Sequence, residues 1–177
     1  MPSDDPQALV RQLALRTVLP ANWRAGLDEV QQQGVFVTPP VGGRVFAVGA
    51  DLGLRASGDA ERLAVLLERL SSTFGHAMWF TTDDVAEVHG WMSATRGQLE
   101  RGYAFAGDAG HVFWHGDVTD AERELGCFVD DPRDTSDDEV KWWPDTRVVC
   151  AVASAWGLDP GRIEGAAAPA VGYCGRL

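Results

Sequence analysis

Lysine is almost absent from this chain, which contains Lys141 and no other lysine. Basic side chains of either kind are scarce, because 15 Lys and Arg residues stand against 26 carboxylates and leave a formal net charge of -11. Nucleic-acid phosphates and anionic membrane surfaces both require a basic protein surface. The composition therefore argues against binding to nucleic acid or to an anionic membrane, and it allows a basic protein partner.

Cysteines and long apolar runs are also few. The three cysteines, Cys127, Cys150 and Cys174, are odd in number and widely spaced, which argues against a disulfide framework or a zinc ribbon. No stretch approaches the roughly 20 apolar residues that cross a bilayer. The first residues, from Met1 to Pro6, have neither the basic region nor the apolar run of a signal peptide. We therefore expect a cytoplasmic protein with reduced thiols.

The motifs of common enzyme classes are missing as well. The chain has no Gly-x-Ser-x-Gly, no Gly-x-x-x-x-Gly-Lys and no dinucleotide-binding glycine pattern after a strand. Lys141 lies in an acidic stretch beside two tryptophans, which is a poor place for a buried catalytic amine. These absences favour a protein without catalysis and without a cofactor.

Local patterns predict helices and strands along most of the chain. Predicted helices begin at Ser3 and extend toward Pro20, then cover 21–33, 59–74, 119–125 and 145–156. Predicted strands cover 35–38, 44–50, 77–81, 85–95, 98–106 and 111–115. An acidic loop spans about 128–143, and the Ala- and Gly-rich tail over 165–177 has no predicted element.

The connections between these strands are short, and short connections require antiparallel pairing. A length of 177 residues with 45% hydrophobic residues is typical of one globular domain. We therefore expect a single α+β domain over 1–177, with an antiparallel sheet of about six strands. This sheet would consist of a hairpin and a meander, with helices packed mainly on one face.

A series of turn and core patterns also occurs in order along the chain. It comprises GVFVTPPVGGRVFAVG from Gly34, LSSTFG from Leu70, HGW from His89, RGYAF from Arg101, GDVTDAERELG from Gly116, and AVASAW from Ala151 before Asp159-Pro160. In these stretches the chain resembles a family of small uncharacterised bacterial α+β proteins. The resemblance implies no activity. Similar proteins often have Thr-His-Arg where this chain has Thr81-Thr82-Asp83, so no role carries over to that position.

The acidic residues concentrate between Gly116 and Asp145. Eleven carboxylates and three bases leave this segment with eight net negative charges. A solvated loop and a landing surface for a basic partner would both have this composition. Two adjacent tryptophans lie near the end of the segment, and an extended chain cannot turn both toward the same core, so we expect one to be exposed. The predicted partner-binding residues are Asp130, Asp131, Asp134, Asp137, Asp138, Glu139, Trp142 and Trp143.

A second candidate site lies on one face of the predicted meander. Alternation along the strands brings together Glu87, His89, Trp91, Arg101, Tyr103, His111 and His115. His111 and His115 would lie about 13 Å apart along a strand, so one ion could not bridge them. We therefore expect no metal site, and aromatic cross-strand pairs on a half-exposed face are the simpler interpretation.

Two functions remain after these arguments. The first is an acidic binding protein that masks a basic protein partner, as an immunity protein or antitoxin masks a toxin. The alternative is a small enzyme or ligand-binding domain that uses Glu87, His89, Trp91, Arg101 and Tyr103. We favour the first because the unusual residues concentrate in the acidic segment.

Overall fold

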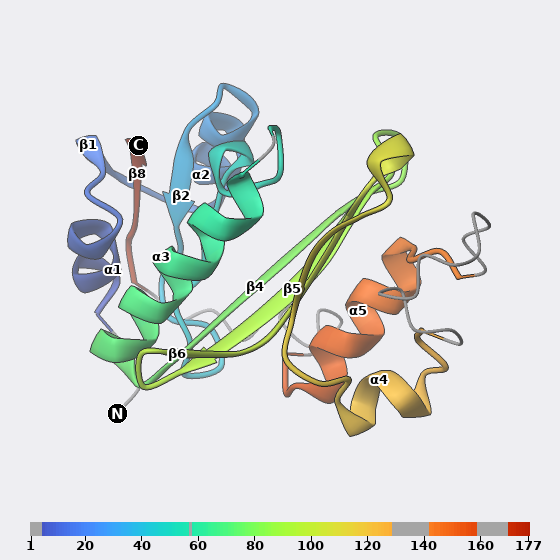
Figure 1. Cartoon of the computed structure of the whole chain (residues 1–177). Coiled ribbons are helices and arrows are strands. Elements are labelled where there is room, and N and C mark those ends of the chain that lie inside the picture. Colours follow the sequence, from blue (N-terminus) through green and yellow to red (C-terminus); the bar gives the residue numbers. More distant parts are fainter. Residues whose placement is uncertain (1–4, 57, 129–141, 159–169) are drawn as a thin grey trace. The chain divides into compact units, whose positions relative to one another are not determined.

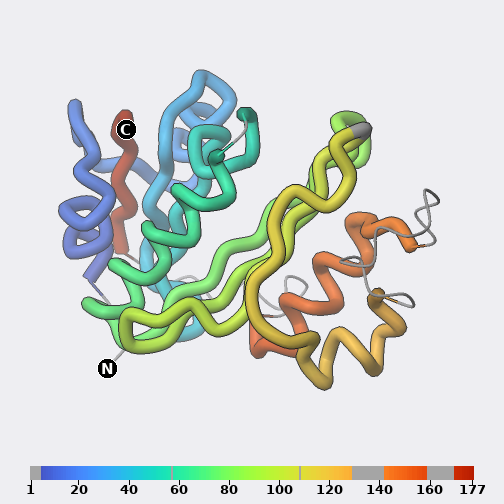
Figure 2. The backbone as a smooth tube through the Cα atoms, in the orientation of Figure 1, coloured from blue at the N-terminus to red at the C-terminus, as the bar shows by residue number. Residues whose placement is uncertain are grey.

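The computed structural model describes residues 5–56, 58–128, 142–158 and 170–177. The chain forms two compact units. Unit 1 comprises Met1–Arg55 and Gly161–Leu177, and unit 2 comprises Ala56–Pro160. Each unit contains one antiparallel sheet of four strands with helices packed on it (Figures 1 and 2). The α+β class is therefore confirmed, but the single sheet of about six strands is wrong.

The sheet of unit 1 has the strand order β1-β8-β2-β3. Its elements are α1 (Pro6–Gln12), β1 (Arg16–Ala21), α2 (Trp23–Gln31), β2 (Val35–Val37), β3 (Ala47–Val48), the short 3-10 helix η1 (Ala50–Leu52) and β8 (Gly172–Arg176). Strands β2 and β3 form the predicted hairpin, with Phe36 opposite Val48. Strand β8 pairs with both β1 and β2, so it lies inside the sheet.

One prediction for unit 1 is wrong, and one segment without a prediction forms a strand. The first helix ends at Gln12 instead of continuing toward Pro20, and Arg16–Ala21 is a strand. The tail, for which the sequence predicts no element, supplies the strand β8. Both differences have one cause, since β1 and β8 pair with each other across more than 150 residues of sequence. A local pattern contains no information about such a partner.

The core of unit 1 forms where α2 packs closely on Phe36, which is fully buried. The Trp23 ring meets the Phe36 ring edge-on, with centroids 5.5 Å apart. Gly26 lies over the same ring, and a Cβ at this position would be 2.5 Å from it. The glycine therefore allows the helix backbone to approach the sheet at this position.

The sheet of unit 2 has the order β4-β5-β6-β7 and is the predicted meander. Its elements are α3 (Asp59–Phe74), β4 (His76–Asp83), β5 (Val88–Thr95), β6 (Gln98–Ala106), η2 (Gly107–Ala109), β7 (His111–His115), α4 (Asp120–Glu124) and α5 (Thr146–Ala155). Trp91 lies opposite Tyr103 in the β5–β6 register, so the predicted antiparallel pairing is confirmed.

Helices cover both faces of this sheet, whereas the sequence predicts them mainly on one face (Figure 1). Helix α3 packs against β4, β5 and β6, on the face where Met92, Ala94 and Ala104 are fully buried. On the opposite face, Val149 and Val152 of α5 pack on Trp91. The acidic segment separates α5 from the other helices in sequence, so local patterns did not reveal which face α5 covers.

Candidate functional site

Most of the predicted partner-binding residues lie outside the described part of the chain. These are Asp130, Asp131, Asp134, Asp137, Asp138 and Glu139. The structure does describe the two tryptophans that follow them. Trp142 is partly buried, and its ring lies 4.7 Å from that of Phe128 and 6.0 Å from that of Tyr103. Trp143 is 55% exposed, and it contacts the Phe105 ring edge-on at 5.1 Å. As the sequence predicts, one of the two tryptophans is exposed.

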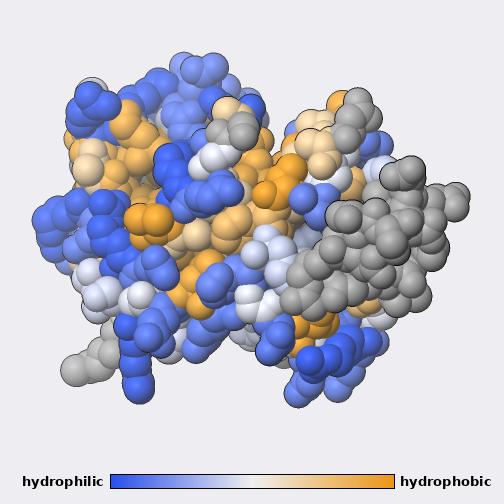
Figure 3. All heavy atoms as spheres, in the orientation of Figure 1, coloured by the Kyte–Doolittle hydropathy of each residue, from blue (hydrophilic) through white to orange (hydrophobic). Residues whose placement is uncertain are grey.

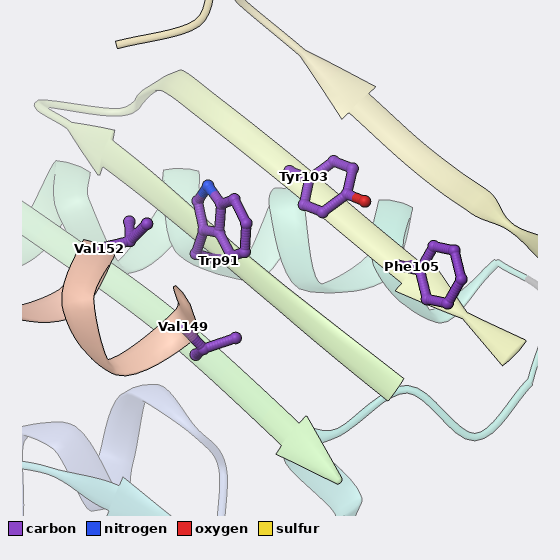
Figure 4. Close-up of a cluster of buried hydrophobic side chains, with 5 residues drawn as sticks. All are labelled: Trp91, Tyr103, Phe105, Val149 and Val152. Carbon is purple, nitrogen blue, oxygen red and sulfur yellow. The ribbon is translucent and has the colours of Figure 1, made fainter. Parts of the chain in front are cut away.

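The residues of the alternative site are brought together, but four of the five are buried. Trp91 and Tyr103 have no exposed surface, and Arg101 and His89 are 2% and 4% exposed. Glu87 is exposed in the turn between β4 and β5. Figure 4 shows Trp91, Tyr103 and Phe105 on adjacent strands, facing Val149 and Val152 of α5. This face is therefore a core and is not half-exposed as the sequence predicts.

Glu122 of α4 is at the centre of the buried polar groups on this face, with no exposed surface. Its carboxylate accepts hydrogen bonds from Arg101 Nε at 2.9 and 3.0 Å and from Trp91 Nε1 at 2.7 Å. It also accepts from the backbone and side chain of Thr119, which completes the predicted capping box. The sequence identified Glu122 only as a capping residue, because its partners on the sheet are more than 20 residues away.

Arg101 is held by this carboxylate, by two carbonyls and by aromatic rings. Nη1 donates to the carbonyls of Gly102 and His115, and the guanidinium lies 4.2 Å above the Trp114 ring. Nη2 has no hydrogen-bond partner in the described part of the chain. Burial lowers the pKa of Arg101, and the Glu122 carboxylate opposes that shift. These contacts direct the guanidinium inward, toward groups of the same unit.

His89 is connected to α5 through two threonine hydroxyls. Thr146 Oγ1 donates to Asp84 Oδ1 at 2.8 Å, because a carboxylate only accepts. Thr146 then accepts from Thr82 Oγ1 at 2.7 Å, and Thr82 accepts from His89 Nδ1 at 3.0 Å. The Thr82 proton therefore points away from the imidazole. A hydroxyl nucleophile must donate to its base, so this arrangement fastens α5 to the hairpin and does not activate Thr82.

The other histidines do not form a common site. Nδ1 of His111 lies 2.9 Å from the Tyr103 hydroxyl, whereas His115 Nε2 contacts the carbonyl of Leu99. Burial lowers the pKa of His111 and raises the pKa of Tyr103. No three His, Cys, Asp or Glu side chains of the described residues are arranged to hold a metal ion.

The turn from β4 to β5 lies at one end of the sheet and has a defined geometry. Asp83 Oδ1 accepts from the backbone N–H of Val85 and of Ala86, and these bonds lower the pKa of Asp83. The Gly107 N–H donates to the carbonyl of Glu87 at 2.8 Å, which joins this turn to η2. Figures 1 and 2 show the β4–β5 turn and the connection between β6 and β7 that contains η2 side by side.

Comparisons with known proteins bring no further information to this site. No family model, no curated protein and no solved structure matches the chain. Within the described residues, no helix has the length and apolar character needed to span a membrane.

Proposed function

We propose that this chain is a non-catalytic acidic binding protein of the immunity or antitoxin kind, which masks a basic protein partner in the cytoplasm. The observation that carries the proposal is Trp143, which is 55% exposed near the end of the acidic segment. Tryptophan is one of the side chains enriched among the residues that contribute most of the binding energy near the centres of protein interfaces. Here it lies near the end of the segment from Gly116 to Asp145, which has eight net negative charges.

The two features have different physical roles in such an interface. The negative segment raises the local potential and speeds the encounter with a basic partner. Exposed charge pairs give little affinity at physiological salt, because they are screened and remain solvated. The indole of Trp143 would supply the desolvated anchor that slows dissociation.

Burial weighs against the alternative function on the sheet face. A substrate or ligand would have to reach His89, Arg101 or Tyr103, which are 4%, 2% and 0% exposed. The hydrogen bonds of Arg101 and the direction of the Thr82 proton also match a structural role. We therefore assign this face to the core of unit 2.

The test begins with a pull-down from the source cell, with the full chain as bait, followed by kinetic binding of the purified captured protein. Reversal of Asp137 and Asp138 to lysine should slow association and flatten its dependence on salt. A matched control reverses Asp28 and Glu61, which are exposed elsewhere and change the net charge equally. If both pairs slow association alike, only the net charge matters and the acidic segment is not the site.

The aromatic anchor has its own kinetic signature. Trp143→Ala should speed dissociation by roughly 30-fold and change association little, because truncation of an anchor costs about 2 kcal/mol. Trp143→Phe should speed dissociation less than Trp143→Ala does. Capture of no basic protein, or unchanged dissociation of Trp143→Ala, would refute the proposed function.

A further inference from the structure

We infer that the partner contact at Trp143 extends over the end of the unit 2 sheet beside the β4–β5 turn, where Val85 enters an apolar pocket on the basic partner. This inference rests on the proposed function, since it concerns the same partner. We call this end the tip surface. It consists of three exposed apolar side chains and three carboxylates: Val85, Val112, Trp143, Asp84, Glu87 and Asp145.

Exposed apolar residues are concentrated at this end of unit 2. Val85 is 97% exposed, in a turn where glycine, asparagine and aspartate are the usual residues. Five large hydrophobic residues are exposed in the described part of unit 2, namely Val65, Val85, Val112, Leu125 and Trp143. Three of the five belong to the tip surface. Scattered apolar residues are ordinary on a protein surface, but a group at one end indicates an interaction site.

Hydrogen bonds fix the backbone that presents Val85. Asp83 Oδ1 accepts from the Val85 N–H at 2.9 Å, and Gly107 N donates to the Glu87 carbonyl at 2.8 Å. On the other side, Thr146 Oγ1 donates to Asp84 at 2.8 Å, so the turn is fastened to α5. A contact surface that is ordered before binding loses less conformational entropy when the complex forms.

Charge identifies the kind of partner that fits the tip surface. The side chains of Asp84 and Asp145 are 66% and 42% exposed, and Glu87 is exposed as well. Arg147 is the nearby base, and it pairs with Asp145 at 3.1 Å. Figure 3 shows hydrophobic and hydrophilic atoms next to one another at this end of the sheet. The complementary surface is an apolar pocket with Lys or Arg side chains at its rim.

The experiment compares Val85 with Val65, an equally apolar residue that is 65% exposed on α3. The probe is the basic protein captured by the full wild-type chain, after purification. Val85→Ala should speed its dissociation about five- to tenfold, because the substitution removes two buried methyl groups. Val65→Ala should leave dissociation within about twofold of wild type. A photoreactive benzoylphenylalanine at position 85 should crosslink to the partner, whereas the same residue at position 65 should not.

The outcomes separate this inference from the proposed function. If Trp143→Ala weakens binding but Val85→Ala behaves like Val65→Ala, the partner exists and binds at Trp143, but Val85 does not contact it and the inference is refuted. If the wild-type chain captures no basic protein, both proposals fail together. Equal crosslinking from positions 85 and 65 would also refute the inference that Val85 contacts the partner.

Discussion

At the scale of single residues, the Glu122 carboxylate connects α4 to the unit 2 sheet. It accepts hydrogen bonds from Trp91, Arg101 and Thr119, and all of these reach it inside the protein. The pair with Arg101 is buried, with side-chain exposures of 2% and 0%. A buried ion pair contributes little relative to apolar residues, but the loss of one partner leaves an uncompensated charge.

We therefore predict that Glu122→Ala lowers the free energy of unfolding by about 3–5 kcal/mol. Urea unfolding followed by tryptophan fluorescence would measure this. The control is Asp120→Ala, which removes an exposed ion pair with Arg123 in the same helix and should change stability little. Equal effects of the two substitutions would show that Arg101 does not depend on Glu122.

His111 gives a prediction about pH. Burial lowers its pKa in the folded state, so the unfolded chain takes up a proton at a higher pH than the folded protein. The contribution of His111 to stability should therefore be present at pH 7.5 and decrease as the pH falls through about 6.5. His111→Gln should remove this part of the pH dependence. The prediction fails if NMR titration gives a midpoint for folded His111 at or above its value in urea.

At the scale of elements, α3 shows how far a periodic pattern can be trusted. The sequence predicts a helix over 59–74 that buries Leu63, Leu66, Leu67 and Leu70, and the helix has those bounds. Leu63, Leu67 and Leu70 are buried, but Leu66 is only partly buried. The pattern determines which side of a helix faces inward, whereas the edge of the contact depends on the surface that it meets.

Leu63→Ala should accordingly lower the free energy of unfolding by about 2–5 kcal/mol, because Leu63 is 1% exposed and its truncation leaves a cavity. Val65→Ala on the exposed side of the same helix is the matched control and should have a much smaller effect. Thermal unfolding of both variants would measure the difference. Similar melting temperatures of the two variants would show that α3 does not contribute to the core of unit 2.

At the scale of the whole molecule, the most consequential element is β8. It supplies a central strand of the unit 1 sheet from the other end of the chain, with Cys174 opposite both Leu19 and Phe36. Strands β1 and β2 do not pair with each other but both pair with β8, and β2 also pairs with β3. Helices α1 and α2 pack on this strand as well.

Deletion of residues 170–177 should therefore unfold unit 1. Hydrogen exchange would show this as a loss of protection in β1 and β2, because β8 is the strand that pairs with β1 and one of the two strands that pair with β2. The amides of β5 and β6 in unit 2 should keep their protection, since that sheet contains no residue from the tail. Protected amides in β2 of the shortened chain would contradict this dependence.

The sequence by itself determined the features that depend on neighbours along the chain. These include the bounds of α3, the capping box at Thr119, the β5–β6 hairpin, and the exposure of one of the two adjacent tryptophans. Each is fixed by side-chain periodicity, a cap or a short turn, and all of these are local. The acidic composition of the segment before Trp143 is likewise a property of sequence alone.

Only the tertiary structure decided the features that join distant segments. It placed β8 between β1 and β2, covered the His89, Arg101 and Tyr103 face with α5, and directed Glu122 toward Arg101. It also brought Trp143 to the end of the sheet where Val85 is exposed. The physical reason is the same in each case. Strand pairing and burial depend on which surfaces meet, and residues far apart in sequence meet only after the chain has folded.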